Sequence, residues 1–144
     1  MPGLALVRQT QSGLMVLVDT SVWIRSLAGR SPYMAELDRL LGRDEVAAHD
    51  LVYGELLIGD RGGRRKLCAA YERMHQAGPV PHRDVVAFVR ARGLHGRGLG
   101  WIDVHLLASA IVGRLQLWTA DSSFSAVANE LGAAYEVPAS KPGH

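Results

Sequence analysis

The stretch from Met15 to Ser21 limits the possible folds of this chain more than any other segment. Four apolar residues, 15–18, run directly into Asp19, and two hydroxyl residues follow it. A short apolar run bounded by polar residues is typical of a strand buried on both faces, as in a parallel sheet. Because ligands bind at the carboxyl ends of strands in open α/β sheets, Asp19 is a candidate site residue. The alternative is that Asp19 only caps the helix that follows.

The rest of the chain alternates short apolar strands with helical patterns. The expected strands are residues 15–18, 45–49, 79–81, 115–119 and 134–137. The expected helices begin near residues 20, 32, 50, 64, 84, 101 and 122. We expect Ser31 to cap the second of these helices, with Pro32 as its first residue, and Asp50 and Asp84 to cap two others. This alternation predicts an α/β fold with a mainly parallel five-stranded sheet flanked by helices.

Length and composition indicate one ordinary globular domain. The 144 residues carry a net charge of +2 and a single cysteine, which excludes an intramolecular disulfide and fits a reducing cytoplasm. No apolar run approaches the ~20 residues of a membrane span, and the first residues lack the apolar region of a signal peptide. We expect residues 1–14 to be a disordered leader, with Met15 as an alternative start, 15–138 to form the domain, and 139–144 to be a tail.

Four acidic residues occupy unusual positions: Asp19, Glu55, Asp103 and Asp121. Glu55 falls in an apolar helical stripe with Leu51 and Ile58, where an unpaired buried carboxylate would be costly. Asp103 and Asp121 each stand at the start of a helix, where capping is the alternative explanation. Four converging carboxylates would repel one another unless a cation held them, and carboxylate oxygens suit Mg²⁺ or Mn²⁺. Such a site polarises a phosphodiester and generates hydroxide for in-line attack.

Several other chemistries lack their required residues. The chain has no Gly-x-x-x-x-Gly-Lys phosphate loop, no Gly-x-Ser-x-Gly nucleophile elbow and no cysteine pair for zinc. A phosphatase that forms an aspartyl phosphate would need a second Asp two residues after Asp19, where Ser21 stands. Metal-assisted phosphodiester cleavage therefore remains the favoured chemistry.

Four segments together make the chain resemble the PIN-domain ribonucleases, specifically the VapC-type toxins of bacterial toxin–antitoxin pairs. They are residues 18–24 (VDTSVWI), 54–59 (GELLIG), 103–110 (DVHLLASA) and 119–124 (TADSSF). Each is weak alone, but all four occur in order and at family-like spacing. The resemblance extends over residues 15–137.

The resemblance implies roles for individual residues. Asp19, Asp103 and Asp121 would ligate the metal, and Glu55 would ligate it or orient the attacking water. Hydroxyl residues would support these acids: Thr20, Ser21 and Thr119. Many relatives carry another acid where this chain has Ser123, so a second metal ion stays open. His105 would contact substrate or make a structural hydrogen bond on its helix.

The same resemblance implies fold, activity and partners. It implies a sheet ordered 3-2-1-4-5, a homodimer and a VapB-type antitoxin. The expected activity is that of a Mg²⁺- or Mn²⁺-dependent endoribonuclease, the toxin of a type II toxin–antitoxin system, in the cytoplasm. It would inhibit translation by cutting structured RNA, with tRNA favoured over rRNA. The alternative is a non-catalytic PIN-fold module that binds RNA or only its antitoxin.

Basic residues beside the acidic segments are candidates for RNA binding. One cluster follows the Glu55 helix and comprises Arg61, Arg64, Arg65 and Lys66. The other lies beside the glycine-rich stretch 93–100 and comprises Arg90, Arg92 and Arg97. Because the catalytic acids repel phosphate, binding would depend on such cations. The alternative for each cluster is an ordinary solvated helix face.

Overall fold

The structure is a computed structural model that describes residues 15–139. Its strands are β1 (Val16–Val18), β2 (Val46–Ala48), β3 (His75–Gln76) and β4 (Gln116–Trp118). Its helices are α2 (Thr20–Leu27), α3 (Tyr33–Gly42), α4 (Asp50–Ile58), α5 (Arg65–Glu72), α6 (His82–Arg92), α7 (Trp101–Gly113) and α8 (Ser122–Glu130). The expected leader, residues 1–14, and most of the expected tail lie outside the described residues. No helix in the described range is long and apolar enough to cross a membrane.

The four strands form one parallel sheet in the order β3-β2-β1-β4. Val16 of β1 pairs with Val46 on one side and with Gln116 on the other. The fifth strand expected at 134–137 is reduced to a single parallel bridge between Leu117 and Ala134. Leu117 makes this bridge: its N–H donates to the carbonyl of Ala133 at 2.7 Å, and its carbonyl accepts the N–H of Tyr135 at 2.9 Å. The α/β fold and the parallel sheet are confirmed, with four strands instead of five.

The third strand lies at a different place from the one expected. We expected a helix from residue 64 and a strand at 79–81, but α5 ends at Glu72 and β3 begins at His75. The prolines at 79 and 81 have no N–H groups to donate to a ladder. His75 instead pairs with Ala47, and the N–H of Ala77 donates to the carbonyl of Ala48 at 2.7 Å.

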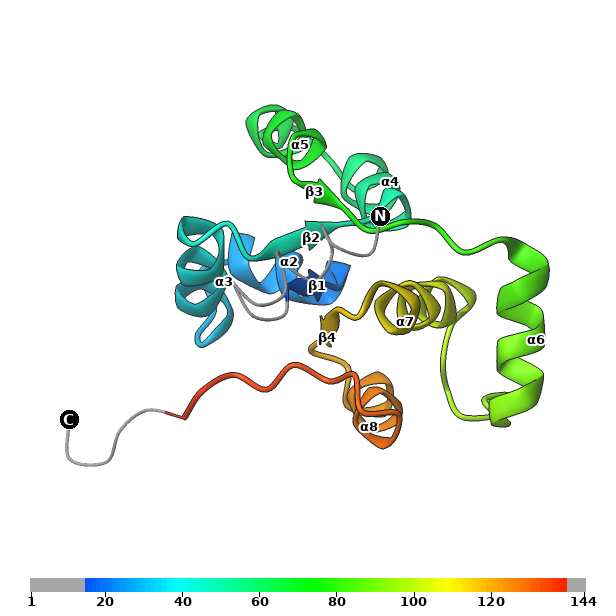
Figure 1. Ribbon diagram of the computed structural model, residues 1–144. Helices are drawn as coiled ribbons and strands as arrows, with labels where there is room; N and C mark the ends of the chain where they lie inside the picture. The colour runs from blue at the N-terminus through cyan, green and yellow to red at the C-terminus, as the bar shows by residue number, and fades with distance from the viewer. Residues whose placement is uncertain (1–14, 140–144) are drawn as a thin grey trace, which may run out of the picture.

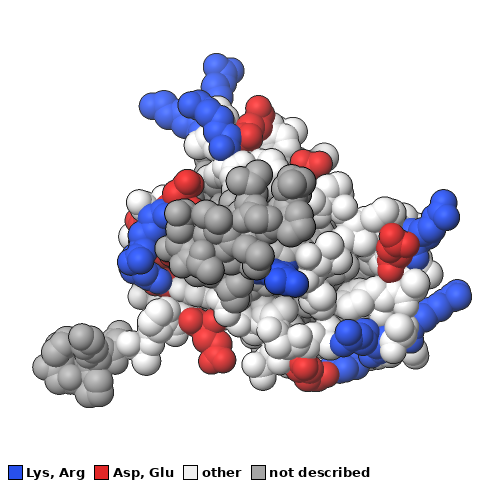
Figure 2. Space-filling view, in the orientation of Figure 1, with Lys and Arg blue, Asp and Glu red and all other residues white. Residues whose placement is uncertain are grey.

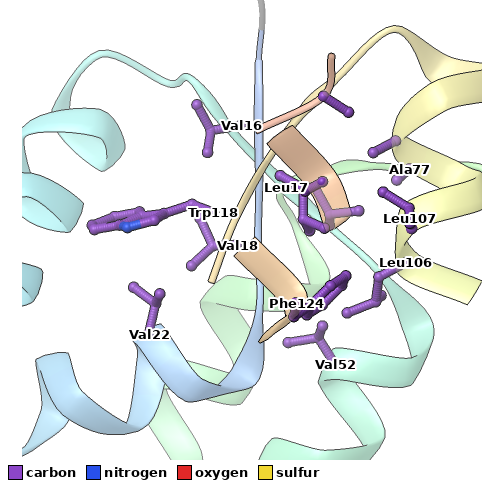
Figure 3. Packing of buried hydrophobic residues seen from close by; sticks show 14 of the residues in the cluster. Val16, Leu17, Val18, Val22, Val52, Ala77, Leu106, Leu107, Trp118 and Phe124 are labelled. Atoms are coloured by element: carbon purple, nitrogen blue, oxygen red, sulfur yellow. The ribbon is translucent and has the colours of Figure 1, made fainter. Parts of the chain in front are cut away.

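Side chains of β1 alternate between the two faces of the sheet (Figure 3). Val16 and Val18 lie with Trp118, whereas Leu17 points to the other side, toward Leu106. Helix α3 covers one face and α7 the other, with α6 packed outside α7 (Figure 1). All three β1 residues are essentially inaccessible to solvent. Burial on both faces explains why this strand is an uninterrupted apolar run.

Helix starts differ from the expected ones by a residue or more. Pro32 occupies the cap position of α3, Pro81 that of α6 and His49 that of α4. Ser31, Asp50 and Asp84 are therefore not the caps. Pro32 precedes the helix, and its carbonyl accepts the N–H of Glu36 at 3.0 Å. Helix α4 begins one residue early because an imidazole nitrogen replaces the expected carboxylate as acceptor.

His49 links β2, α4 and α7 through a buried imidazole. Its Nδ1 accepts the N–H of Leu51 at 3.1 Å, so the ring proton of the neutral form lies on Nε2. Nε2 is 3.0 Å from the Ser109 hydroxyl on α7. Burial lowers the pKa of His49 below its ordinary value, opposed by the Asp50 charge and reinforced by His105. The folded protein therefore favours the uncharged ring.

We predict that His49→Asn reduces the acid sensitivity of the fold. The unfolded chain protonates His49 below about pH 6.5, whereas the folded protein resists protonation. This contribution to stability is complete above that pH and is lost as the pH falls, by at most about 1.4 kcal/mol per pH unit for one proton. Asn keeps an acceptor for the Leu51 N–H but does not titrate.

Urea unfolding at pH 7.5 and pH 5.5 measures the effect. The wild type should lose more free energy of unfolding over this interval than the variant, whatever their difference at pH 7.5. An equal loss in the two proteins would show that His49 is not the titrating group.

Candidate functional site

Asp19 lies at the carboxyl end of β1 and is 7% exposed. It occupies the cap position of α2 but makes no side-chain capping hydrogen bond, so the capping alternative is wrong. Its Oδ2 instead accepts hydrogen bonds from the hydroxyls of Ser21 and Thr119, each at 2.8 Å. Ser21 lies in the first turn of α2, and Thr119 directly follows β4, the strand that pairs with β1.

The two hydroxyls are oriented by backbone groups from the β4–α8 connection. Ser21 Oγ accepts the N–H of Ala120 at 3.0 Å, and Thr119 Oγ1 accepts the N–H of Asp121 at 3.1 Å. The hydroxyls lie 3.2 Å apart. Each has a single proton, so when both donate to Asp19 neither can donate to the other. The backbone thus fixes the hydroxyls, and they fix one oxygen of the carboxylate.

Glu55 approaches the same edge of the sheet from α4. Its Oε1 accepts a hydrogen bond from Thr20 Oγ1 at 2.6 Å. The expected apolar stripe through Glu55 and Ile58 is wrong, because Ile58 is 89% exposed. Val52 and Leu56 form the buried face of α4, and the Glu55 side chain is half-buried beside them. The carboxylate therefore keeps access to solvent or to a ligand.

Asp103 lies in the first turn of α7, half-buried, and its Oδ2 accepts the N–H of Gly100 at 2.8 Å. Burial raises the pKa of Asp103, an effect that the hydrogen bond from Gly100 opposes. The negative charges of Asp19, Asp121 and Glu55 raise the pKa of Asp103 further. The four acids from separate parts of the chain therefore share one electrostatic environment.

Asp121 caps α8 as the alternative explanation proposed. Its Oδ1 accepts the N–H groups of Ser123 at 2.9 Å and Phe124 at 3.1 Å. Asp103 likewise accepts a backbone N–H with one oxygen. In each case the bonds found among the described residues fall on one carboxylate oxygen, and the second oxygen has none. Capping and ligand binding are therefore compatible at both residues.

The donor set suits a hard divalent cation. It consists of carboxylate oxygens, and the uncompensated charge around Asp103 would be relieved by a cation. Within residues 15–139, no group of three or more Asp, Glu, His or Cys side chains is placed so that it could hold a metal ion as it stands. Mg²⁺ commonly takes only one or two protein carboxylates and keeps several waters. The chemistry fits such an ion, and direct ligation by Asp19, Asp103 and Asp121 stays a prediction.

Two of the arginines expected to bind RNA have protein partners. Arg64 Nη1 donates to the carbonyl of Leu56 at 2.9 Å, which satisfies the end of α4. Arg97 forms an ion pair with Glu130 of α8 at 2.6 Å. On the face shown in Figure 2, basic side chains gather over α5 and around α6. The other five candidates are exposed: Arg61, Arg65, Lys66, Arg90 and Arg92.

His105 belongs to an aromatic cluster that the sequence motifs did not identify. Its ring lies 4.9 Å from that of Trp101 and 6.2 Å from that of His82, measured between centroids. Trp101 is 44% exposed at the start of α7, directly after the glycine-rich stretch. The sequence feature that could have indicated this cluster is Trp101, which stands two residues before Asp103.

Comparison with known proteins identifies the family. The PIN domain model matches residues 16–130. Ribonuclease VapC32 of Mycobacterium tuberculosis, in strains CDC 1551 and H37Rv, is 42% identical over 121 residues, which cover 83% of this chain and 95% of the relative. Among solved structures, FitAcB from Neisseria gonorrhoeae aligns with a TM-score of 0.54 at 23% identity, over 80% of this chain and 94% of that one, and shows the shared fold. The chain therefore belongs to the PIN-domain family and, within it, to the VapC type.

Proposed function

We propose that this protein is a metal-dependent endoribonuclease that acts as the toxin of a type II toxin–antitoxin system. The main support is the convergence of four carboxylates from four elements, seen in the influence of three of them on the pKa of Asp103. The relative with 42% identity is named a ribonuclease. Carboxylates at the carboxyl edge of a parallel sheet are suited to phosphodiester chemistry with Mg²⁺ or Mn²⁺.

The proposed mechanism divides the work among the acids. When bound, the cation polarises a phosphate oxygen and favours deprotonation of the attacking water. The second oxygens of Asp19, Asp103 and Asp121 would hold the cation, because protein donors already occupy their first oxygens. Glu55, fixed by Thr20, would hold the cation or accept a hydrogen bond from the water. Ser21 and Thr119 keep Asp19 in place.

We further propose that the substrate is structured RNA, with tRNA favoured over rRNA, and that cleavage stops translation. A homodimer in the cytoplasm, with a VapB-type antitoxin as partner, completes the proposal. The second candidate is a non-catalytic module that binds RNA or only the antitoxin. Metal-dependent cleavage of RNA by the purified protein separates the two.

The first test of this function removes one acid without removing its hydrogen bond. Asp103→Asn should abolish cleavage in Mg²⁺ or Mn²⁺, because Asn can still accept the Gly100 N–H but carries no charge. The raised pKa of Asp103 means that its ionisation opposes folding at neutral pH in metal-free protein. The free energy of unfolding in EDTA should therefore rise, or at least not fall.

Asp38→Asn is the matched control, because Asp38 is an exposed acid on α3. It should cleave like the wild type. Cleavage by Asp103→Asn at the wild-type rate and equal metal concentration would refute the metal site.

The antitoxin would need an apolar surface beside the acids. Exposed apolar side chains lie on α2 and α4, two helices in contact: Ile24, Leu27, Leu57 and Ile58. A hollow of about 500 Å³ between α4 and α5 adjoins Leu57 and Tyr53. Trp23 of α2 is buried against Tyr71 and therefore does not contribute to this surface. We propose that an amphipathic antitoxin helix docks here and that its tail places an Arg or Lys among the acids.

Two changes should separate docking from inhibition. Ile58→Asp should weaken co-purification with the antitoxin, whereas Val112→Asp, an exposed position on α7, should not. Replacing every basic residue of the antitoxin tail should restore RNA cleavage in the complex. Full inhibition by such a tail would contradict insertion of a cation among the acids.

The arginine cluster on α6 gives a test of how RNA is held. We predict that Arg92→Ala/Arg97→Ala weakens RNA binding and lowers its salt dependence by ~0.7 in slope for each phosphate of a single strand that the variant no longer binds. Arg97 already pairs with Glu130, so Arg92→Ala alone should produce most of the effect. The cleavage position should not change, since cations bound to phosphate do not read bases. Filter binding at several salt concentrations measures this slope. An unchanged slope in the double variant would show that these arginines form a solvated face and do not bind RNA phosphates.

A further inference from the structure

Arg25 lies on the face of α2 that carries Ser21, one of the two residues that hold Asp19. Residues four apart lie one above the other on a helix, and helical side chains lean toward the amino end. The Arg25 side chain does so, because its Nη1 donates to the carbonyl of Ser21 at 3.2 Å. Ser21 Oγ in turn donates to Asp19 Oδ2 at 2.8 Å. A single residue therefore separates the guanidinium group from the carboxylate at the end of β1.

A second set of contacts places the same guanidinium group beside the end of β4. Its Cζ lies over the Tyr33 ring, 5.8 Å from the centroid. Tyr33 stacks on Trp118, with centroids 6.1 Å apart and an interplanar angle of 25°. Trp118 is the last residue of β4 and directly precedes Thr119, the other hydroxyl residue that holds Asp19. Two separate routes therefore lead from Arg25 to the two hydroxyls around one carboxylate.

The charge of Arg25 is not balanced by an acidic side chain among the described residues. The ion pairs found in residues 15–139 use other cations, namely Arg39, Arg43 and Arg97. The partners of Arg25 are a carbonyl oxygen and an aromatic ring, which leave its positive charge in place. The side chain is half-buried, so N–H groups that it does not use within this part of the chain can reach a ligand. Arg25 is thus a fixed, uncompensated cation at the edge of the acidic site.

A planar cation in this position suits a phosphate of the RNA backbone. The N–H groups of a guanidinium match two phosphate oxygens at once. Because the acids repel the backbone, a strand that approaches them needs a cation at the same edge of the sheet. The basic clusters near α5 and α6 are candidates from sequence alone, whereas contacts link Arg25 to Asp19 through one residue.

The position of Arg25 on α2 separates it from the surface proposed for the antitoxin. Ile24 and Leu27, the exposed apolar residues of this helix, lie about 100° and 200° around the helix from Arg25. An apolar helix docked on those side chains would therefore cover a different face. RNA, and not the antitoxin, is the partner that the charge and the place of Arg25 favour.

We propose that Arg25 binds the RNA phosphate next to the one that is cleaved, and so is a substrate-binding residue of the active site. This inference rests on the proposed ribonuclease function. The neighbouring phosphate is assigned because Ser21 stands between the guanidinium group and Asp19, whereas the cleaved phosphate would lie at the cation among the acids. Such a contact sets the register of the strand without reading its bases.

Binding without metal measures this contact in the absence of cleavage. A synthetic RNA hairpin that the wild type cuts is titrated into the full-length protein in EDTA at several salt concentrations. Arg25→Gln should bind about tenfold more weakly, the low end for a hydrogen bond to a charged group, because the side chain is half-exposed. Its salt slope should fall by ~0.7, the value for one phosphate of a single strand. Arg25→Lys keeps the charge and should keep the slope.

Kinetics in Mg²⁺ give a second readout. If Arg25 binds a phosphate that does not react, Arg25→Gln should raise KM about as much as it weakens binding and leave kcat unchanged. Arg114→Gln is the matched control, because Arg114 is exposed and precedes β4, at the edge of the sheet opposite the acids. It should change neither the affinity nor the slope, and thermal unfolding should show that the variants are folded.

A change in the RNA identifies the phosphate. A methylphosphonate linkage removes the charge of one phosphate, and it is placed in turn at each linkage beside the cut. One such linkage should weaken binding to the wild type and have little further effect on Arg25→Gln, because both changes remove the same contact.

The outcomes separate this inference from the proposed function. If the wild type cuts RNA and Arg25→Gln keeps its affinity and slope, the phosphate contact is overturned. A lower kcat without weaker binding, or a loss of antitoxin binding alone, also overturns it. If the wild type binds the hairpin but cuts no RNA, the nuclease function fails and the slopes still decide the phosphate contact. If it binds no RNA, both proposals fall. If Arg25→Gln does not fold, Arg25→Met, which keeps the apolar stem, takes its place.

Discussion

The burial of the Asp19 carboxylate is the constraint from which the arrangement of the site follows. A charged group at 7% exposure is costly unless donors hold it, and here two hydroxyls do so. Ser21 lies in the first turn of α2 and Thr119 directly follows β4, so satisfying one charge also joins the start of α2 to the end of β4. Because the N–H of Asp121 donates to Thr119, the same network fixes the start of α8 and delivers a second acid. The donors that stabilise the fold at this edge are therefore those that assemble the site.

The acids repel one another, and this repulsion contributes to the raised pKa of Asp103. Burial is the larger cause, and the charges of Asp19, Asp121 and Glu55 add to it. Hydrogen bonds limit this penalty without removing it, because each is made to one oxygen of a carboxylate and leaves its charge in place. A site of this kind is suited to a divalent cation because the cation would relieve the repulsion that hydrogen bonds leave.

Much of the fold could be predicted because its central elements carry their own patterns. The apolar run of β1, the apolar length of α7 and the carboxylate before α8 each specify their element locally, and the parallel sheet is as expected. Strand β3 could not be predicted, because His75–Gln76 has no strand pattern and forms only by pairing with the edge of β2. The predicted buried face of α4 was wrong for a related reason. Apolar residues lie on both sides of Glu55 along α4, and tertiary packing alone selects Val52 and Leu56 as the buried pair.

The candidate acids also show why capping and function need not be alternatives. A helix cap can use one carboxylate oxygen and leave the second oxygen without a hydrogen bond. At Asp121 the capped N–H groups belong to Ser123 and Phe124, and at Asp103 the bound N–H belongs to Gly100. In both cases the backbone orients the side chain, which would otherwise rotate freely. A residue whose position is explained by local structure can therefore still be a candidate ligand, since the local structure is what holds the remaining oxygen in a fixed direction.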